Sequence, residues 1–148
     1  MNITKIIQWD MGHRILNHRS VCRGLHGHRY KAEITVSGAL IQNSGKSEEG
    51  MVMDFSDIKK IALEEIHEKL DHGFMVWEKD DELLKFFGDS EGHKPVIVPF
   101  TPTAENVAIY IYDKIKSRFK DRFGTGLHLH SVKLWETPSS FVIHTVDG

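Results

Sequence analysis

The amino-acid sequence predicts an α+β fold in which an antiparallel sheet carries two helices on one face. Three observations support this prediction: strand-like segments follow one another in the chain, two segments show helical spacing, and these two segments are well separated. The chain has 148 residues, of which 40% are hydrophobic and 27% charged. This size and composition are typical of one compact domain, which would span residues 1–148.

Two strands are predicted in the first quarter of the chain. Residues 3–13 have apolar side chains mostly at odd positions, which indicates a strand that ends at His13. Residues 29–37 alternate with the same period of two, and an early start of this strand would place two histidines on its apolar face. Residues 14–21 are polar and basic, so we expect a loop that returns the second strand to the side of the first.

A hairpin loop, a third strand and a first helix are expected next. The loop covers residues 38–50, which are polar and contain several glycines, and the strand covers residues 51–55. Ser56 is a suitable N-cap, and apolar residues recur at helical spacing from there until Gly73 interrupts the pattern. This helix therefore carries an aspartate-histidine pair at its C-terminal end.

The second half of the chain is predicted to contain a second helix and three further strands. Residues 74–100 show only one or two helical turns and a short strand at residues 96–98. Pro102 opens the second helix, and residues 141–143 form a final short strand. Residues 127–136 alternate as a strand with Leu127, Leu129 and Trp135 on one face and His128, His130, Val132, Leu134 and Glu136 on the other.

Charge and hydropathy argue against several classes of partner. The formal net charge is −2, the isoelectric point is near 6.5, and no basic cluster is present, which argues against nucleic acid or an anionic membrane as the main partner. No segment reaches the ~20 apolar residues of a membrane span, and the N-terminus lacks the apolar core of a signal peptide. We therefore expect a cytoplasmic protein.

The segment from Cys22 to His28 has the features of a reactive site. On an extended strand His26 and His28 project from one face, about 6–7 Å apart along the backbone, so both can bind one metal ion. The preceding loop can bring His13 to the same ion. Ten histidines against one cysteine favour zinc bound by nitrogen. The alternatives are that the pair only caps a strand, or that the metal site is structural.

Five motifs in this order resemble the 6-pyruvoyltetrahydropterin synthase / 6-carboxytetrahydropterin synthase (QueD) family: His13, Cys22 to His28, Asp71-His72, Pro102 to Glu105, and Glu136-Thr137. Residues 53–59 also match the strand-to-helix junction of that family, so the resemblance covers nearly the whole chain. The sequence departs from the family pattern at residues 75–100, which are longer than in compact bacterial members.

The resemblance implies the tunnelling fold, in which a four-stranded antiparallel sheet carries two helices and the subunits assemble into barrels. In this family trimeric barrels pair as hexamers, and each active site takes its zinc and cysteine from one subunit and its aspartate-histidine pair from a neighbour. The implied partners are therefore further copies of the chain, forming a homohexamer, and a small pterin triphosphate substrate. Neither nucleic acid nor a membrane is implied.

The spacing of the motif indicates one branch of this family. Three residues separate Cys22 from His26, as in the QueD type. The resemblance therefore implies a zinc-dependent carbon–carbon lyase that converts 7,8-dihydroneopterin triphosphate to 6-carboxy-5,6,7,8-tetrahydropterin, acetaldehyde and triphosphate, in queuosine and 7-deazaguanine biosynthesis. The alternatives are a 6-pyruvoyltetrahydropterin synthase, which expels triphosphate without losing carbon, and a non-catalytic module that binds zinc or a pterin.

The resemblance also implies a metal centre with an adjacent general base. His13, His26 and His28 would hold Zn²⁺ and leave one position open for the hydroxyls of the substrate's side chain, where zinc acts as a Lewis acid. Cys22 would be the general base, because a nearby dication and Arg23 favour its thiolate form. The alternative for a lone cysteine is a buried structural residue.

Five further residues complete the predicted site. Asp71 and His72 would be a second acid/base set, for which the helix must end, since adjacent side chains can hardly pair within a regular helix. Their alternative role is to satisfy the helix C-terminus. Glu136 would anchor the pterin ring by accepting two hydrogen bonds, with Thr137 beside it. Glu105 is a further substrate-binding candidate, although stabilising the helix dipole is its ordinary role.

The sequence does not decide the roles of two sets of basic residues. His128 and His130 have the same strand spacing as the metal-binding pair, so they form either a second metal pair or part of a surface or interface. The candidates for binding the triphosphate are Arg14, Arg19, Arg23, Lys31 and Lys133.

Overall fold

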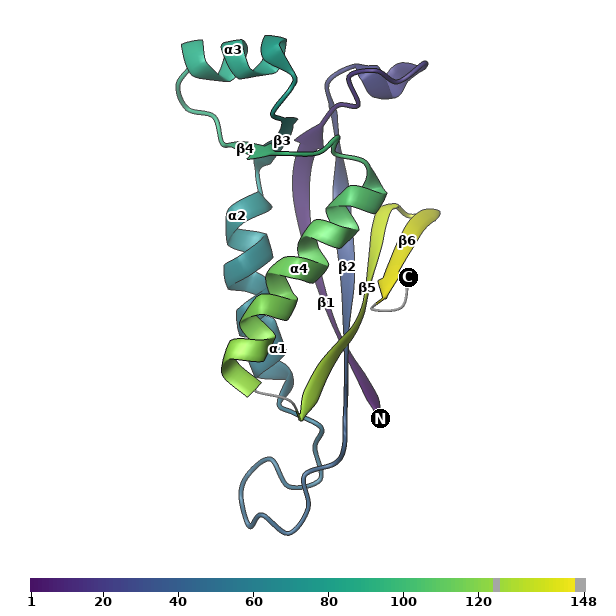
Figure 1. The fold of residues 1–148 in the computed structure, drawn as a ribbon, viewed down its shortest axis with the longest axis vertical. Helices are drawn as coiled ribbons and strands as arrows, with labels where there is room; N and C mark the ends of the chain where they lie inside the picture. Colours follow the sequence, from purple (N-terminus) through teal and green to yellow (C-terminus); the bar gives the residue numbers. More distant parts are fainter. Residues whose placement is uncertain (124–125, 146–148) are drawn as a thin grey trace.

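The computed structural model describes residues 1–123 and 126–145, so residues 124, 125 and 146–148 of the predicted domain lie outside it. The described residues form a six-stranded sheet in the order β4-β3-β1-β2-β5-β6, with the longer helices on one face (Figure 1). The strands are β1 (Asn2–His13), β2 (His26–Gly38), β3 (Gly73–Trp77), β4 (Pro95–Val98), β5 (Leu127–Thr137) and β6 (Ser140–Thr145).

The helical elements fall into two long rods and two short pieces. The first rod is continuous and consists of α1 (Phe55–Ala62), the π-helical turn η2 (Leu63–His67) and α2 (Glu68–Leu70). The second rod is α4 (Ala104–Phe123), and the short pieces are the 3₁₀ turn η1 (Val21–Arg23) and α3 (Asp81–Asp89). Among the described residues, none of the helices has both the length and the apolar character that crossing a bilayer requires.

The structure confirms the α+β class and extends the predicted sheet. Strands β1, β2, β5 and β6 pair antiparallel, which is the predicted four-stranded arrangement. Strands β3 and β4 add two parallel pairings at the β1 edge, so the sheet is mixed. Strand β3 was not predicted, because its apolar residues form a short run without alternation.

The strand predicted at residues 51–55 is wrong. Asp54 is the N-cap of α1, because its Oδ1 accepts a hydrogen bond of 2.7 Å from the backbone N–H of Ser56. The helix therefore begins at Phe55, earlier than the predicted cap at Ser56. Val52 and Met53 lie in an irregular segment, and both side chains are buried. Their burial explains why these positions are apolar although they do not form a strand.

The predicted strict alternation in residues 127–136 is also wrong. A register shift against β2 leaves His130 as an extra residue in β5. The inward face therefore changes parity at this point, so Leu129 and Val132 both lie in the core. His128 and His130 are exposed. The shift has no glycine or proline to mark it in the sequence.

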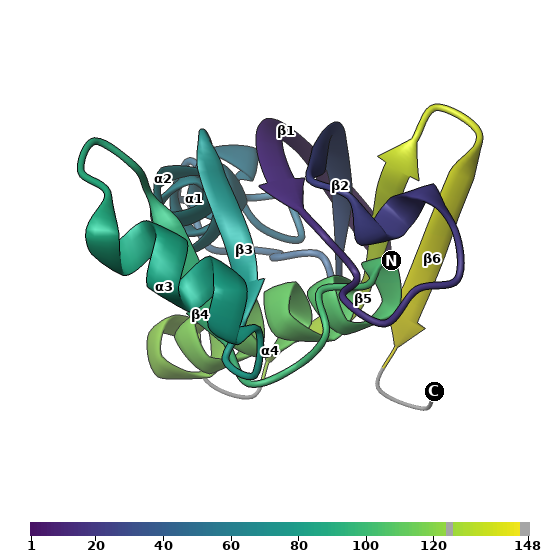
Figure 2. The ribbon, with the colours of Figure 1, turned by 90° about the horizontal axis from the view of Figure 1, so that it is seen from above.

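Alternation in β1 and β2 gives the sheet one buried face, which the long helices cover. In β1 the odd residues from Ile7 to His13 are buried and the even ones are more exposed. In β2 the even residues from Tyr30 to Val36 are buried, and the odd residues between them are half-buried. Figures 1 and 2 show α3 and residues 14–25 at the same end of the molecule, where β1 ends and β2 begins. The loop between β2 and α1 lies at the opposite end.

Candidate metal centre

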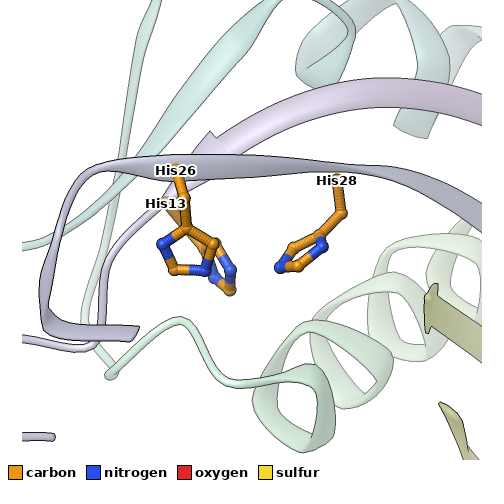
Figure 3. Close-up of side chains that lie close together, drawn as sticks. All are labelled: His13, His26 and His28. Atoms are coloured by element: carbon orange, nitrogen blue, oxygen red, sulfur yellow. The ribbon is translucent and has the colours of Figure 1, made fainter. Parts of the chain in front are cut away.

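Three histidines converge where β1 ends and β2 begins. His13 is the last residue of β1 and pairs with His26, the first residue of β2, while His28 follows on the same face. Their rings project from one side of the two strands toward a shared space (Figure 3). One possible ligand atom from each ring lies within 4.8 Å of the others. The structure thus brings the three predicted ligands together.

Backbone carbonyls fix the orientation of two of these rings. The Nδ1–H of His13 donates to the carbonyl of Pro102 at 2.7 Å, and the Nδ1–H of His26 donates to the carbonyl of Gly24 at 2.8 Å. Each bond leaves Nε2 as the nitrogen with a free lone pair. Metal-binding histidines are commonly held in this way, with the second nitrogen bonded to a carbonyl or carboxylate. The Pro102 carbonyl could not be assigned to the site from the sequence.

The environment of the cluster keeps two imidazoles neutral at physiological pH. His13 is only 1% exposed, and its burial, together with the neighbouring histidines, lowers its pKa to about 4. Burial also lowers the pKa of His28, although the nearby carboxylate of Glu136 acts in the opposite direction. A metal ion binds neutral imidazole, so both residues are in the binding form without having to release a proton.

The low pKa of His13 predicts that acid destabilises the metal-free protein. The unfolded chain takes up a proton near pH 6.5 and the folded chain near pH 4, so His13 contributes its full stabilisation above about pH 6.5. That contribution, at most about 3 kcal/mol, is lost as the pH falls toward 4. Urea unfolding with a chelator present, from pH 7 to pH 4.5, measures it. His13→Gln should flatten the profile in this range, and an equally steep profile in that variant would contradict the assignment.

The donor set fits a zinc ion. Three imidazoles and one open position are typical of catalytic zinc sites, whereas structural sites have four protein ligands. Zn–N bonds of about 2.1 Å in a tetrahedral site separate the ligand nitrogens by about 3.4 Å. The three rings already lie close to this arrangement, so small side-chain rotations would complete it.

Tyr30 is a buried neighbour of the cluster that sequence reasoning did not identify. Its side chain is fully buried, and its hydroxyl lies 3.4 Å from Nδ1 and 3.5 Å from Nε2 of His13. Burial raises its pKa, so the phenol is neutral and can donate a hydrogen bond. The sequence does contain a sign of this position. Tyr30 is two residues after His28 in an alternating strand, so it lies on the face that carries His26 and His28.

Glu136 and Thr137 lie beside the cluster. Oε1 of Glu136 is 3.9 Å from Nε2 of His28. Both residues line a hollow of about 460 Å³ together with His28 and Trp135. A ligand held by the Glu136 carboxylate would therefore lie next to His28, one of the three clustered histidines.

Asp71 and His72 form the predicted side-chain pair. The helix ends at Leu70, Asp71 is extended, and His72 has a φ of 58°, which turns the chain sharply. Oδ2 of Asp71 accepts a 2.7 Å hydrogen bond from Nδ1–H of His72, and Oδ1 accepts one of 3.0 Å from the backbone N–H of Asp10. These two bonds lower the pKa of Asp71. The His72 side chain is 82% exposed, so its other nitrogen can reach a substrate.

The remaining predicted residues lie outside the histidine cluster. Cys22 lies in η1 and is half-buried, and its carbonyl accepts a 2.9 Å hydrogen bond from the N–H of Ile15. Glu105 is exposed in the first turn of α4. The metal-binding group found among the described residues contains neither His128 nor His130.

Comparison with known proteins identifies related chains. Residues 2–146 match the family model described as 6-pyruvoyl tetrahydropterin synthase. The chain is 36% identical over 141 residues to a 6-carboxy-5,6,7,8-tetrahydropterin synthase of Rickettsia felis, covering 94% of this chain and 96% of the relative. It is 34% identical over 142 residues to the synthase of that name from Haemophilus influenzae, covering 94% of each. The 6-pyruvoyl tetrahydropterin synthase structure from Caenorhabditis elegans superposes with a TM-score of 0.71 at 23% identity, over 98% of this chain and 94% of that one, and supports the predicted tunnelling fold.

Proposed function

Because the chain belongs to the 6-pyruvoyl tetrahydropterin synthase family, we propose that it is a zinc-dependent 6-carboxy-5,6,7,8-tetrahydropterin synthase. The proposed reaction converts 7,8-dihydroneopterin triphosphate and one water molecule to 6-carboxytetrahydropterin, acetaldehyde and triphosphate in the cytoplasm, on the route to queuosine. The observation that carries the proposal is the convergence of three histidines beside Glu136. This arrangement would place an anchor for the pterin ring beside a metal site.

The protein groups of the site would position the substrate around the cluster. His13, His26 and His28 would hold zinc, which when bound supplies a Lewis acid that polarises a side-chain oxygen of the substrate. Glu136 would accept hydrogen bonds from the amino group and the adjacent N–H of the pterin ring, as a carboxylate does from a guanidinium. Its separation of 3.9 Å from His28 would direct the substrate's side chain toward the cluster.

Proton transfer would fall to two further sets of residues. Cys22 would remove a proton from the substrate's side chain, and His72 would exchange a proton with the substrate from the other side. Asp71 supports this role because its hydrogen bond to Nδ1–H fixes the tautomer of His72 and leaves Nε2 to react.

We propose a homohexamer built as a dimer of trimers, with active sites at subunit interfaces. The histidine cluster lies on the helix-covered face of β1 and β2, whereas the Asp71-His72 pair lies at the edge of β1 beside Asp10. The two edge strands also carry exposed apolar side chains, Ile97 on β4 and Ile143 on β6, which favour contacts between subunits. A neighbouring copy would bring its own Asp71-His72 pair to the cluster.

The triphosphate would lie on the side of the cluster that faces away from Glu136. Arg19 and Arg23 line a hollow of about 610 Å³ with Gly24, whose carbonyl holds His26. Arg14 lines the same hollow, but its guanidinium is engaged by Asp80. Of the candidates in the sequence, Arg19 and Arg23 are therefore best placed to pair with phosphate oxygens.

Replacing Glu136 by glutamine is expected to weaken pterin binding. An amide offers one acceptor oxygen and places an NH₂ group against the ring donors, so one hydrogen bond to a charged group is lost. Such a bond contributes about 1.5–3 kcal/mol, which corresponds to roughly a 10- to 100-fold rise in the KM for the substrate. Steady-state kinetics with zinc content measured in parallel would show this. Unchanged KM and kcat would remove the anchor assignment.

The proposal is tested by identifying both products. Zinc-loaded protein is incubated with 7,8-dihydroneopterin triphosphate, and the pterin and acetaldehyde are identified by mass. A pyruvoyl product without acetaldehyde would favour the second candidate, a 6-pyruvoyltetrahydropterin synthase, which the description of the matching family model supports. Zinc and pterin binding without turnover would favour the non-catalytic module.

A further inference from the structure

A buried ion pair joins Arg14, the residue after the end of β1, to Asp80 at the start of α3. Arg14 is 9% exposed and Asp80 only 2% exposed. The guanidinium donates from Nε to Oδ2 at 2.7 Å and from a terminal nitrogen to Oδ1 at 2.5 Å, so both carboxylate oxygens are used. These two hydrogen bonds hold the pKa of Asp80 below its ordinary value.

Hydrogen bonds to the backbone hold the chain in place at or next to each member of this pair. Asp80 is the N-cap of α3, where its Oδ1 accepts the backbone N–H of Leu83 at 3.2 Å. Arg14 directly follows His13, and the N–H of the next residue, Ile15, donates to the carbonyl of Cys22 at 2.9 Å. A continuous path therefore runs from α3 through Asp80, Arg14 and Ile15 to Cys22.

The ion pair needs an explanation beyond stability. Burying two charges carries a large desolvation cost, and a buried ion pair is often no more stable than well-packed apolar residues of the same size. A fork of two parallel hydrogen bonds does, however, fix the relative position of the two groups closely. The ring of His13 is already held by the Pro102 carbonyl, so its orientation does not depend on Arg14.

We infer that Arg14 and Asp80 are positioning residues that hold the segment of residues 14–22, and with it Cys22, in place. The pair acts through the backbone bond between Ile15 and Cys22, without touching the substrate. The role assigned to Cys22 in turnover rests on the proposed function, whereas the placement of its thiol does not. Figures 1 and 2 show α3 and residues 14–25 at the same end of the molecule.

Asp80→Asn tests the inference, because asparagine keeps the helix cap and removes the buried charge that pairs with Arg14. Arg14 then keeps only its 3.3 Å contact with the exposed carboxylate of Glu82. We expect a folded protein with unchanged zinc content, a kcat lowered by about 10- to 100-fold and a KM within about twofold, as for loss of an outer partner of a site. Cys22 is the only cysteine, so its alkylation by iodoacetamide is a direct readout. Its alkylation rate should rise by about an order of magnitude as the segment loosens.

The matched control is Asp89→Asn, which removes an exposed carboxylate from the same helix, where it pairs with Lys85. This control should match the wild-type protein in both measurements. The double variant Arg14→Met/Asp80→Asn leaves no unpaired buried charge, so it should fold even if the single variant does not, and it should restore neither kcat nor slow alkylation.

Three results would overturn the inference. A folded Asp80→Asn protein with wild-type kcat and alkylation rate would do so, as would a folded double variant with both values restored. Unfolding of both variants would show that the pair determines folding instead of position. If the wild-type protein made no pterin product, the proposed function would fail, but the alkylation rates would still decide the role of the pair.

Discussion

His26→Ala is expected to lose zinc and activity together. His26 supplies one of three ligands from the first residue of β2, and the remaining two imidazoles leave a site with half of its coordination positions unfilled by protein. Losing a direct ligand should cost more than the 10- to 100-fold in metal affinity that follows loss of an outer partner. Zinc content after dialysis, measured by atomic emission alongside turnover, checks this result.

A matched control for this variant is His130→Ala. His130 also lies on a strand of the sheet, but it is exposed at the register shift in β5 and outside the cluster. It should retain stoichiometric zinc and full turnover. If His26→Ala kept stoichiometric zinc after dialysis, the assignment of the metal centre would be wrong.

Cys22→Ala is expected to keep zinc and lose activity. Cys22 lies in η1, outside the cluster of histidines, so its removal leaves all three ligands and their backbone partners intact. General-base catalysis contributes about 10²- to 10⁴-fold, which is the expected fall in kcat. Turnover and zinc content measured on the same preparation separate this effect from loss of the metal.

Cys22→Ser distinguishes a chemical role from packing. Serine nearly preserves the shape of the side chain but has a much less acidic group, so it should be almost as inactive as alanine. If Cys22 were only a buried structural residue, serine would restore turnover. Retained zinc with full activity in the alanine variant would exclude the general-base role altogether.

The sequence predicted the centre of the site because its signals were local. The spacing of His26 and His28 and their phase with the apolar face of β2 required only the period of a strand. The placement of His13 depended on the pairing of β1 with β2. Two alternating segments that follow each other in the chain usually form neighbouring strands, so this pairing was the simplest prediction. The pairing of Asp71 with His72 followed from the end of a helix before Gly73.

The features that the sequence did not predict depend on contacts between distant residues. Strand β3 is short and has no alternation, and its place is set by pairing with β1 and β4. The Arg14–Asp80 pair joins residues that are 66 positions apart, and nothing near either residue marks the other. The register shift in β5 likewise depends on the neighbouring strand, so local periodicity assigned its faces wrongly.

The π-helical turn η2 allows the helix that precedes Asp71 and His72 to contain one extra residue without moving them. A π-helical turn holds one more residue than an α-helical turn, and such turns occur mostly as single insertions within α-helices. In a regular helix an added or deleted residue rotates everything that follows by about 100°. Within residues 63–67 the extra residue is absorbed, so Leu70 is still fully buried and Asp71 still meets the backbone of Asp10. A chain that differs by one residue between Asp54 and Asp71 can therefore keep Asp71 and His72 in the same place at the edge of β1.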